Sequence, residues 1–100
     1  MPARSKELPS LQTWKPTALA KAFGAVVRNE RQRQGMTRLD LAVRSGMKPR
    51  YLGRLERGEC VPGLPTITAL AAALERPLDT LIGMVEDQVA AGRCAPEDVK

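Results

Sequence analysis

Basic side chains gather between positions 15 and 60 of this chain, most densely in the stretch MTRLDLAVRSGMKPRYLGRLERG from Met36 to Gly58. Residues 15–60 hold eleven Lys and Arg against four Asp and Glu, a net charge of +7, whereas residues 61–100 hold three against six, a net charge of −3. A folded surface with this much positive charge suits a polyanion such as nucleic acid. A solvated helix face is the alternative explanation of the charge alone.

Residue types that hold metals or catalyse reactions are scarce. The chain has no His, and Cys60 and Cys94 follow no metal-ligand spacing, so we expect no metal site and two reduced thiols. The sequence also lacks a Gly-rich phosphate loop, paired carboxylates and a nucleophile motif. We therefore expect no enzyme activity, no cofactor and no small-molecule ligand.

Length and composition predict a single all-α domain. One hundred residues can bury one core, and the only aromatics are Trp14, Phe23 and Tyr51, a poor supply for a β-sheet. Residues 1–15 are expected to form an irregular arm, residues 16–91 the folded domain and residues 92–100 a polar tail. No apolar run is long enough for a signal peptide or a membrane helix, so we expect a cytoplasmic protein without membrane contact.

Capping and breaking residues divide the domain into five predicted helices. Pro16 suits the first turn of a helix over 17–34, which Gly35 ends. Thr37 caps a short helix to position 45, and Gly46 permits the left-handed turn that closes it. Pro49 opens the third helix, over 49–57, and two more follow, from position 63 or 66 to about 74 and over 77–91. The inner faces of the second and third helices are expected to be formed by Leu39, Leu41, Ala42, Leu52 and Leu55.

The second and third predicted helices have the form of a helix-turn-helix. Two short helices are joined by a tight turn that contains Gly, and the second carries basic residues opposite its buried side. With Leu52 and Leu55 inward, the third helix directs Arg50, Gly53, Arg54 and Arg57 outward, and Tyr51 flanks them. Such a helix is of a size to enter the major groove of DNA.

The chain from Phe23 to Ile82 resembles the Cro and phage-repressor family of helix-turn-helix regulators. The resemblance rests on Thr37, Leu41-Ala42, Gly46, the LERG of Leu55 to Gly58, and the PLDTLI that opens the fifth helix, together with Pro62, Leu52 and Leu55. It implies a compact five-helix fold like that of lambda repressor. It also implies a sequence-specific DNA-binding transcriptional regulator, above all a repressor, of bacterial, phage or plasmid origin.

The resemblance assigns roles to individual residues. Base contacts fall on Lys48, Pro49, Arg50, Gly53 and Arg54. Phosphate contacts fall on Thr37, Arg38, Tyr51 and Arg57. An ion pair between Arg31 and Glu56 is expected to join the first helix to the third. The sequence departs from the common pattern at Arg38, where many relatives have Gln, and at Lys48, where many have Ser or Thr.

Assembly and biological context are less specified. A homodimer on a palindromic operator is expected, with Ile82, Val85 and Val89 of the fifth helix as its interface. The alternative for this apolar surface is that Leu11 and Trp14 of the arm cover it. A protein-interaction adaptor with the same fold is a second reading of the whole chain, and an enzyme-associated nucleic-acid-processing module is a third. Within the regulator class, phage repressor, restriction-modification controller and antitoxin remain open.

Overall fold

Pro16 begins the longest helix of the structure, α1 (Pro16–Arg33), and Gly35 follows its end with a φ of +73°. The computed structural model describes residues 14–91. Within that range there are five helices and no strand, which confirms the all-α class. The other four are α2 (Arg38–Ser45), α3 (Pro49–Glu56), α4 (Leu64–Ala73) and α5 (Leu78–Ala90). Apart from Trp14 and Lys15, the predicted arm lies outside the described residues, as does the predicted tail.

Local hydrogen bonds define the two ends of α2. The Asp40 N–H donates to Thr37 Oγ1 at 3.0 Å and the Thr37 N–H donates to Asp40 Oδ2 at 2.9 Å, which completes a capping box. At the other end Gly46 has a φ of +74°, and the Met47 N–H donates to the carbonyl oxygen of Ala42. Pro49 then occupies the first turn of α3. The turn between the two helices is therefore as short as the sequence predicted.

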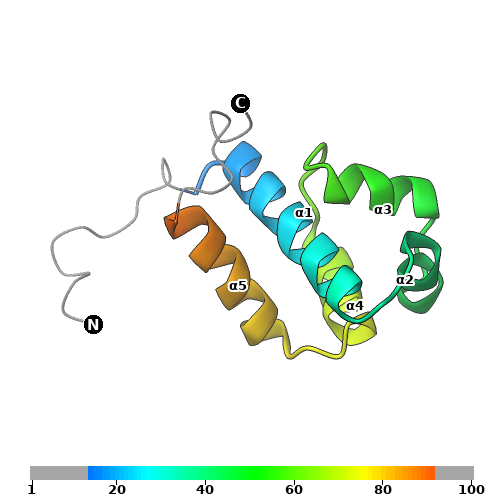
Figure 1. Ribbon diagram of the computed structural model, residues 1–100. Coiled ribbons are helices and arrows are strands. Elements are labelled where there is room, and N and C mark those ends of the chain that lie inside the picture. Colours follow the sequence, from blue (N-terminus) through cyan, green and yellow to red (C-terminus); the bar gives the residue numbers. More distant parts are fainter. Residues whose placement is uncertain (1–13, 92–100) are drawn as a thin grey trace, which may run out of the picture.

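The five helices are arranged around α1 (Figure 1). It packs against α5 along one side and against α3 on the other, while α4 contacts both α2 and α5. Gly24 marks the point where α1 and α3 meet most closely. A Cβ at Gly24 would overlap the backbone carbonyl oxygens of Leu55 and Glu56, so no larger residue fits without moving α3. This contact fixes the position of the C-terminal end of α3.

The core lies between α1 and the four shorter helices. Leu41, Ala42, Leu52 and Leu55 are fully buried in it, as expected, but Leu39 is 59% exposed and the prediction that it faces inward was wrong. Leu39 precedes Leu41 by two residues, which is about 200° around an α-helix. Because α2 buries the side that carries Leu41 and Ala42, Leu39 is turned to solvent. No helix within residues 14–91 is long and apolar enough to span a membrane.

Candidate nucleic-acid interface

The exposed side of α3 carries most of the cations that the sequence singled out. Leu52 and Leu55 are fully buried, whereas Arg50, Arg54 and Arg57 are exposed, together with Lys48 and Pro49 at the start of the helix. Arg50, Arg54 and Arg57 are spaced so that they share one side of the helix. The structure thus brings these cations onto one surface.

Gly53 lies on this side of α3, as its helical spacing predicts, but it is buried. A Cβ built on Gly53 would lie 3.3 Å from Arg57 Nη1 and 3.7 Å from both Cδ and Nη1 of Arg38. The two arginine side chains therefore lie over the glycine. Helical periodicity gave the direction of Gly53 correctly, but it could not show that a side chain from α2 would cover this position.

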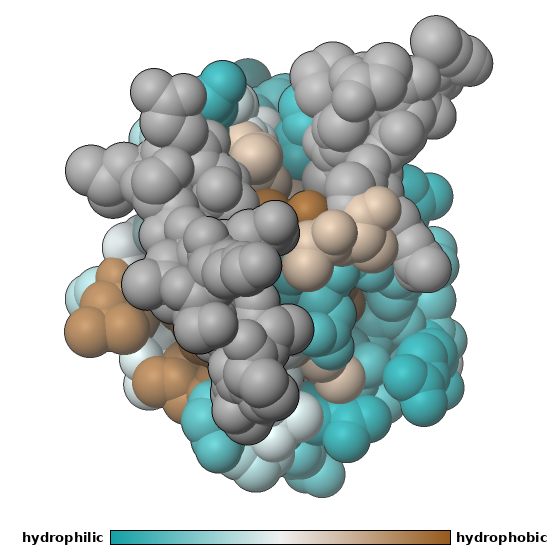
Figure 2. Space-filling model, turned by 90° about the vertical axis from the view of Figure 1, so that its left-hand side faces the viewer, coloured by the Kyte–Doolittle hydropathy of each residue, from teal (hydrophilic) through white to brown (hydrophobic). Residues whose placement is uncertain are grey.

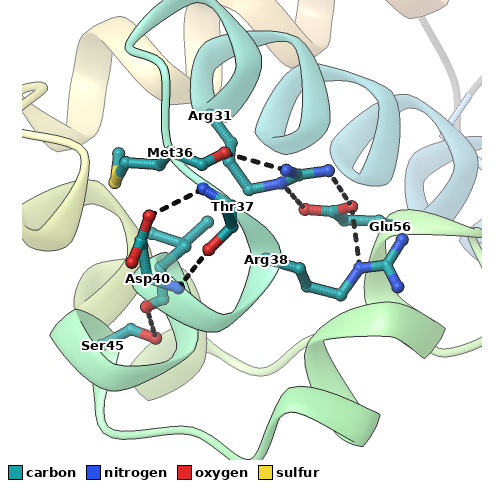
Figure 3. A network of polar contacts seen from close by, with 8 residues as sticks. Arg31, Met36, Thr37, Arg38, Asp40, Ser45 and Glu56 are labelled. Carbon is teal, nitrogen blue, oxygen red and sulfur yellow. Dashed lines mark hydrogen bonds and ion pairs between the residues drawn. The ribbon is translucent and has the colours of Figure 1, made fainter.

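An ion pair joins α3 to α1. Arg31 Nε donates to Glu56 Oε2 at 2.7 Å and Arg31 Nη2 donates to Glu56 Oε1 at 3.0 Å. Arg31 Nη1 also donates to the carbonyl oxygen of Met36 at 3.0 Å, so the guanidinium holds the connection between α1 and α2 as well (Figure 3). The Glu56 side chain is only 1% exposed. A buried carboxylate needs such a partner, because burial without one is costly.

Arg38 approaches the same carboxylate from α2. Its Nε lies 3.5 Å from Glu56 Oε1, and Figure 3 shows Arg31 and Arg38 on opposite sides of Glu56. Its side chain remains 46% exposed, so part of the guanidinium is available to an external anion. The sequence placed Arg38 at the surface through the family resemblance but did not associate it with Glu56.

Glu59 is a site residue that the sequence reasoning missed. Arg57 Nε donates to Glu59 Oε2 at 2.7 Å, and Arg54 Nε lies 3.9 Å from Glu59 Oε1. The hydrogen bond from Arg57 holds the pKa of the Glu59 carboxyl below its ordinary value, and the same bond raises the pKa of Arg57. Glu59 follows Arg57 by two residues in the sequence, and this short spacing between opposite charges could have indicated the ion pair. Two of the exposed arginines of this surface therefore share one carboxylate.

Thr37 and Tyr51, two of the predicted phosphate contacts, have structural roles in the domain. The Thr37 hydroxyl accepts the Asp40 N–H in the capping box, although the residue is exposed. Tyr51 is half-buried and packs against the core. A hydroxyl group both donates and accepts hydrogen bonds, so these contacts leave each side chain with further hydrogen-bonding capacity. Their first task is to define where α2 begins and how α3 lies on the core.

A second buried acid, Glu30, was not found from the sequence. It accepts from Arg76 Nε at 2.8 Å and from Arg33 Nη1 at 3.2 Å, while its side chain is 3% exposed. Arg76 follows α4 in the chain, so this pair ties α1 to the connection between α4 and α5. The partners are 46 residues apart, and no local pattern relates them.

The predicted dimer residues of α5 fall into two environments. Val85 is 5% exposed and belongs to the monomer core, so it has almost no surface left for a partner, and its assignment to an interface is corrected. Ile82 is 36% exposed and Val89 is half-buried. Ile82 and Trp14 line the same apolar groove, of about 320 Å³, while Leu11 lies outside the described residues. Figure 2 shows apolar residues at the surface on the side of the molecule that carries α5.

The geometry defines a class of protein, a small helical domain with a helix-turn-helix, and comparison with known proteins agrees. A family model for the helix-turn-helix domain matches residues 22–81. The chain belongs to the helix-turn-helix family, and like other members of this family it is a DNA-binding regulatory protein. A comparison with curated protein sequences gave no significant match.

Two solved structures illustrate the likeness. The restriction-modification controller protein C.AhdI from Aeromonas hydrophila is 34% identical, with a TM-score of 0.60 over 62% of this chain and 94% of that one. The clp gene regulator ClgR from Corynebacterium glutamicum is 30% identical, with a TM-score of 0.71 over 81% of this chain and 85% of that one. Both come from bacteria. The resemblance predicted from the sequence is thereby confirmed.

Proposed function

We propose that this protein is a sequence-specific transcriptional repressor that places α3 in the major groove of double-stranded DNA. The observation that carries the proposal is the exposed row of arginines on α3, a helix that follows a tight turn and is held to α1 by the buried Arg31–Glu56 pair. A major groove about 12 Å wide admits one α-helix. Repression, rather than activation, follows from the resemblance to the phage repressors. No step of this function needs catalysis or a cofactor.

The roles of single residues follow from their positions on α3. Arg50 and Arg54 are exposed. An arginine side chain can form bidentate hydrogen bonds with the O6 and N7 atoms of guanine. Lys48 and Pro49 lie at the N-terminal end of the helix, the end that comes nearest to the base edges in this motif. The residues proposed to hold phosphates are Thr37, Arg38, Tyr51 and Arg57. Gly53 is not among the proposed base contacts, because the side chains of two arginines cover it.

The proposal includes a homodimer on a palindromic operator. One copy of α3 reads only a few base pairs, and a two-fold pair places two recognition helices about 34 Å apart, one turn of the double helix. The apolar surface of α5, at the exposed Ile82 and the half-buried Val89, supports this pairing. Apolar surface on a small domain is often an interaction site. The names of C.AhdI, a controller protein, and ClgR, a gene regulator, are in keeping with a regulatory function.

Selection from random duplex DNA, followed by binding measurements on the selected site, tests this function. We expect the wild-type protein to enrich a two-fold symmetric sequence with guanine in each half-site. Arg54→Ala should weaken binding to that site by about 1–3 kcal/mol and relax the preference at one base position, because a bidentate contact is lost. Fluorescence anisotropy on the selected site and its single-base variants measures both effects.

Arg28→Ala is the matched control, since Arg28 is an exposed arginine on α1 outside the helix-turn-helix. It removes the same charge and should leave the base preference unchanged. Equal weakening of Arg54→Ala on the selected and random duplexes would contradict the role of Arg54 in reading bases. Failure of the wild-type protein to enrich any sequence would contradict the proposed function itself.

A further inference from the structure

A glycine occupies the centre of the surface that is proposed to meet DNA. Gly53 shares one side of α3 with Arg50, Arg54 and Arg57 by their helical spacing. Glycine inside a helix is less stable than alanine because its backbone loses more freedom on folding. At Gly24 the cost has a steric reason, since backbone atoms of α3 occupy the space of a Cβ. At Gly53 the nearest atoms belong to arginine side chains, which are flexible, so packing alone does not require glycine.

The two arginines over Gly53 come from different helices and bring their guanidinium groups together. Arg38 reaches across from the first residue of α2, and Arg57 reaches back from the end of α3. Their Nη1 atoms lie 3.7 and 3.3 Å from the position of the missing Cβ, so they are at most 7.0 Å apart. Charge-assisted hydrogen bonds from arginine to phosphate are about 2.7–2.9 Å long. Nitrogens at this separation can therefore donate to oxygens of a single phosphate group.

Carboxylates behind the two arginines orient them. Glu56 lies 3.5 Å from Arg38 Nε, and Glu59 lies 2.7 Å from Arg57 Nε. Each guanidinium has five N–H donors, and one carboxylate does not use them all. The side chains are 46% and 54% exposed, so the remaining donors are accessible from solvent. The paired acids also reduce the repulsion between two like charges held this close.

We propose that Arg38 and Arg57 together bind one backbone phosphate of DNA over Gly53, and that glycine at position 53 keeps this site open. The inference rests on the proposed function, because it takes α3 to be the DNA-facing helix. In this proposal Gly53 makes no contact with a base. Its lack of a side chain leaves the space that the phosphate occupies. The phosphate held there sets how closely and at what angle α3 enters the groove.

Gly53→Ala separates this role from a structural one. Its Cβ meets only the flexible end of Arg57 and the Arg38 side chain, so the domain should fold and its urea midpoint should rise with the better helix former. Binding to the selected site and to random duplex should both fall, by roughly tenfold, as for the loss of a charge-assisted contact. Gly83→Ala is the matched control, because a Cβ at that position in α5 meets no atom within 4 Å. It should gain stability without the loss of affinity.

The salt dependence of binding shows whether the phosphate is shared. Loss of one phosphate contact lowers the slope of log K against log salt by about 0.9. For a shared phosphate, the Arg38→Gln, Arg57→Gln double variant should lower the slope by about that amount in total, and each single variant by no more. A decrease near 1.8 in the double variant, with half in each single one, would assign two separate phosphates and overturn the proposal.

The proposed function and this inference fail in different ways. If the wild-type protein enriches no sequence and binds random duplex no better than Arg28→Ala and Gly53→Ala do, both are wrong. If the wild-type protein selects an operator and Gly53→Ala binds it as tightly as Gly83→Ala does, the function stands and the shared phosphate site is overturned.

Discussion

At the scale of single residues, the proposed recognition surface is a set of arginines whose charges are already partly balanced by acids. Glu59 contacts Arg57 at 2.7 Å and lies 3.9 Å from Arg54. When DNA binds, its phosphates must compete with this carboxylate for the same guanidinium groups. The competition is weak, because exposed ion pairs in water contribute little to stability. We still expect it to lower the affinity for DNA of any sequence.

Glu59→Gln is therefore expected to raise the affinity for random duplex severalfold and to reduce discrimination between the operator and random DNA. The effect should be present at neutral pH, where a glutamate is ionised at its ordinary pKa and all the more at the lowered pKa of Glu59. Fluorescence anisotropy with both duplexes at two salt concentrations measures it. Glu75→Gln makes the same charge change in the connection after α4 and should have a much smaller effect. Equal behaviour of the two variants would show that net charge alone is responsible.

At the scale of helices, α3 keeps its orientation through the ion pair that anchors it to α1. Removing one partner of such a buried pair is expected to destabilise the fold by about 3–5 kcal/mol. Arg38 Nε lies 3.5 Å from Glu56 Oε1 and can take over part of the pairing when Arg31 is removed. We therefore expect Arg31→Met to lower the free energy of unfolding by less than Glu56→Ala does. A double-mutant cycle with Arg31→Met and Glu56→Gln on urea unfolding should give a clear coupling energy. Additive losses would mean that the two residues act independently.

The start of α2 has its own pH dependence. The hydrogen bond from the Thr37 backbone N–H to the Asp40 carboxylate lowers the pKa of Asp40, with further contributions from the Thr37 side chain and Arg44. A carboxyl with a lowered folded pKa stabilises the fold fully above its unfolded value, about 3.9 for Asp, and loses this contribution as pH falls through the folded value.

Asp40→Asn should thus be less stable than the wild type at neutral pH, and the difference should shrink as pH falls below about 4. Thermal unfolding of both proteins between neutral and acidic pH tests this. The comparison cancels the titration of the other carboxyls. A difference independent of pH would show that the capping box does not depend on the charge of Asp40.

At the scale of the whole molecule, the question is which surface pairs two copies. Ile82→Glu should leave the helical content unchanged by circular dichroism, because the residue is 36% exposed, and should shift sedimentation toward the monomer. Binding to the operator should weaken much more than binding to random DNA. Val85→Glu should instead unfold the domain, since Val85 is 5% exposed and the core would receive an unpaired charge.

Val43→Glu controls for the addition of an acidic residue at an apolar surface position. Val43 is 72% exposed on α2, far in the fold from α5, so its substitution should leave the mass of the assembly unchanged. If Ile82→Glu remains dimeric, another surface forms the pair. The palindromic operator would then lose its structural support from α5.

The sequence by itself determined the helices and their ends, because the forces involved act within a few residues. Thr37 and Asp40 cap α2 through bonds between neighbours, Gly46 permits a backbone conformation that other residues avoid, and Pro49 suits a helix start. Periodicity also identified Leu52 and Leu55 as the buried side of α3, and hence the exposed arginines. The pairing of Arg31 with Glu56 came from the family resemblance, not from spacing.

Only the tertiary structure decided what lies above or behind these residues. Arg38 and Arg57 cover Gly53, Arg76 pairs with Glu30 across 46 residues, and Val85 is enclosed by the core instead of facing a partner. Helical periodicity gives the direction of a side chain around its own axis. It does not say which neighbouring helix stands in that direction, because the packing of α1 against α3 and α5 depends on close contacts such as that at Gly24.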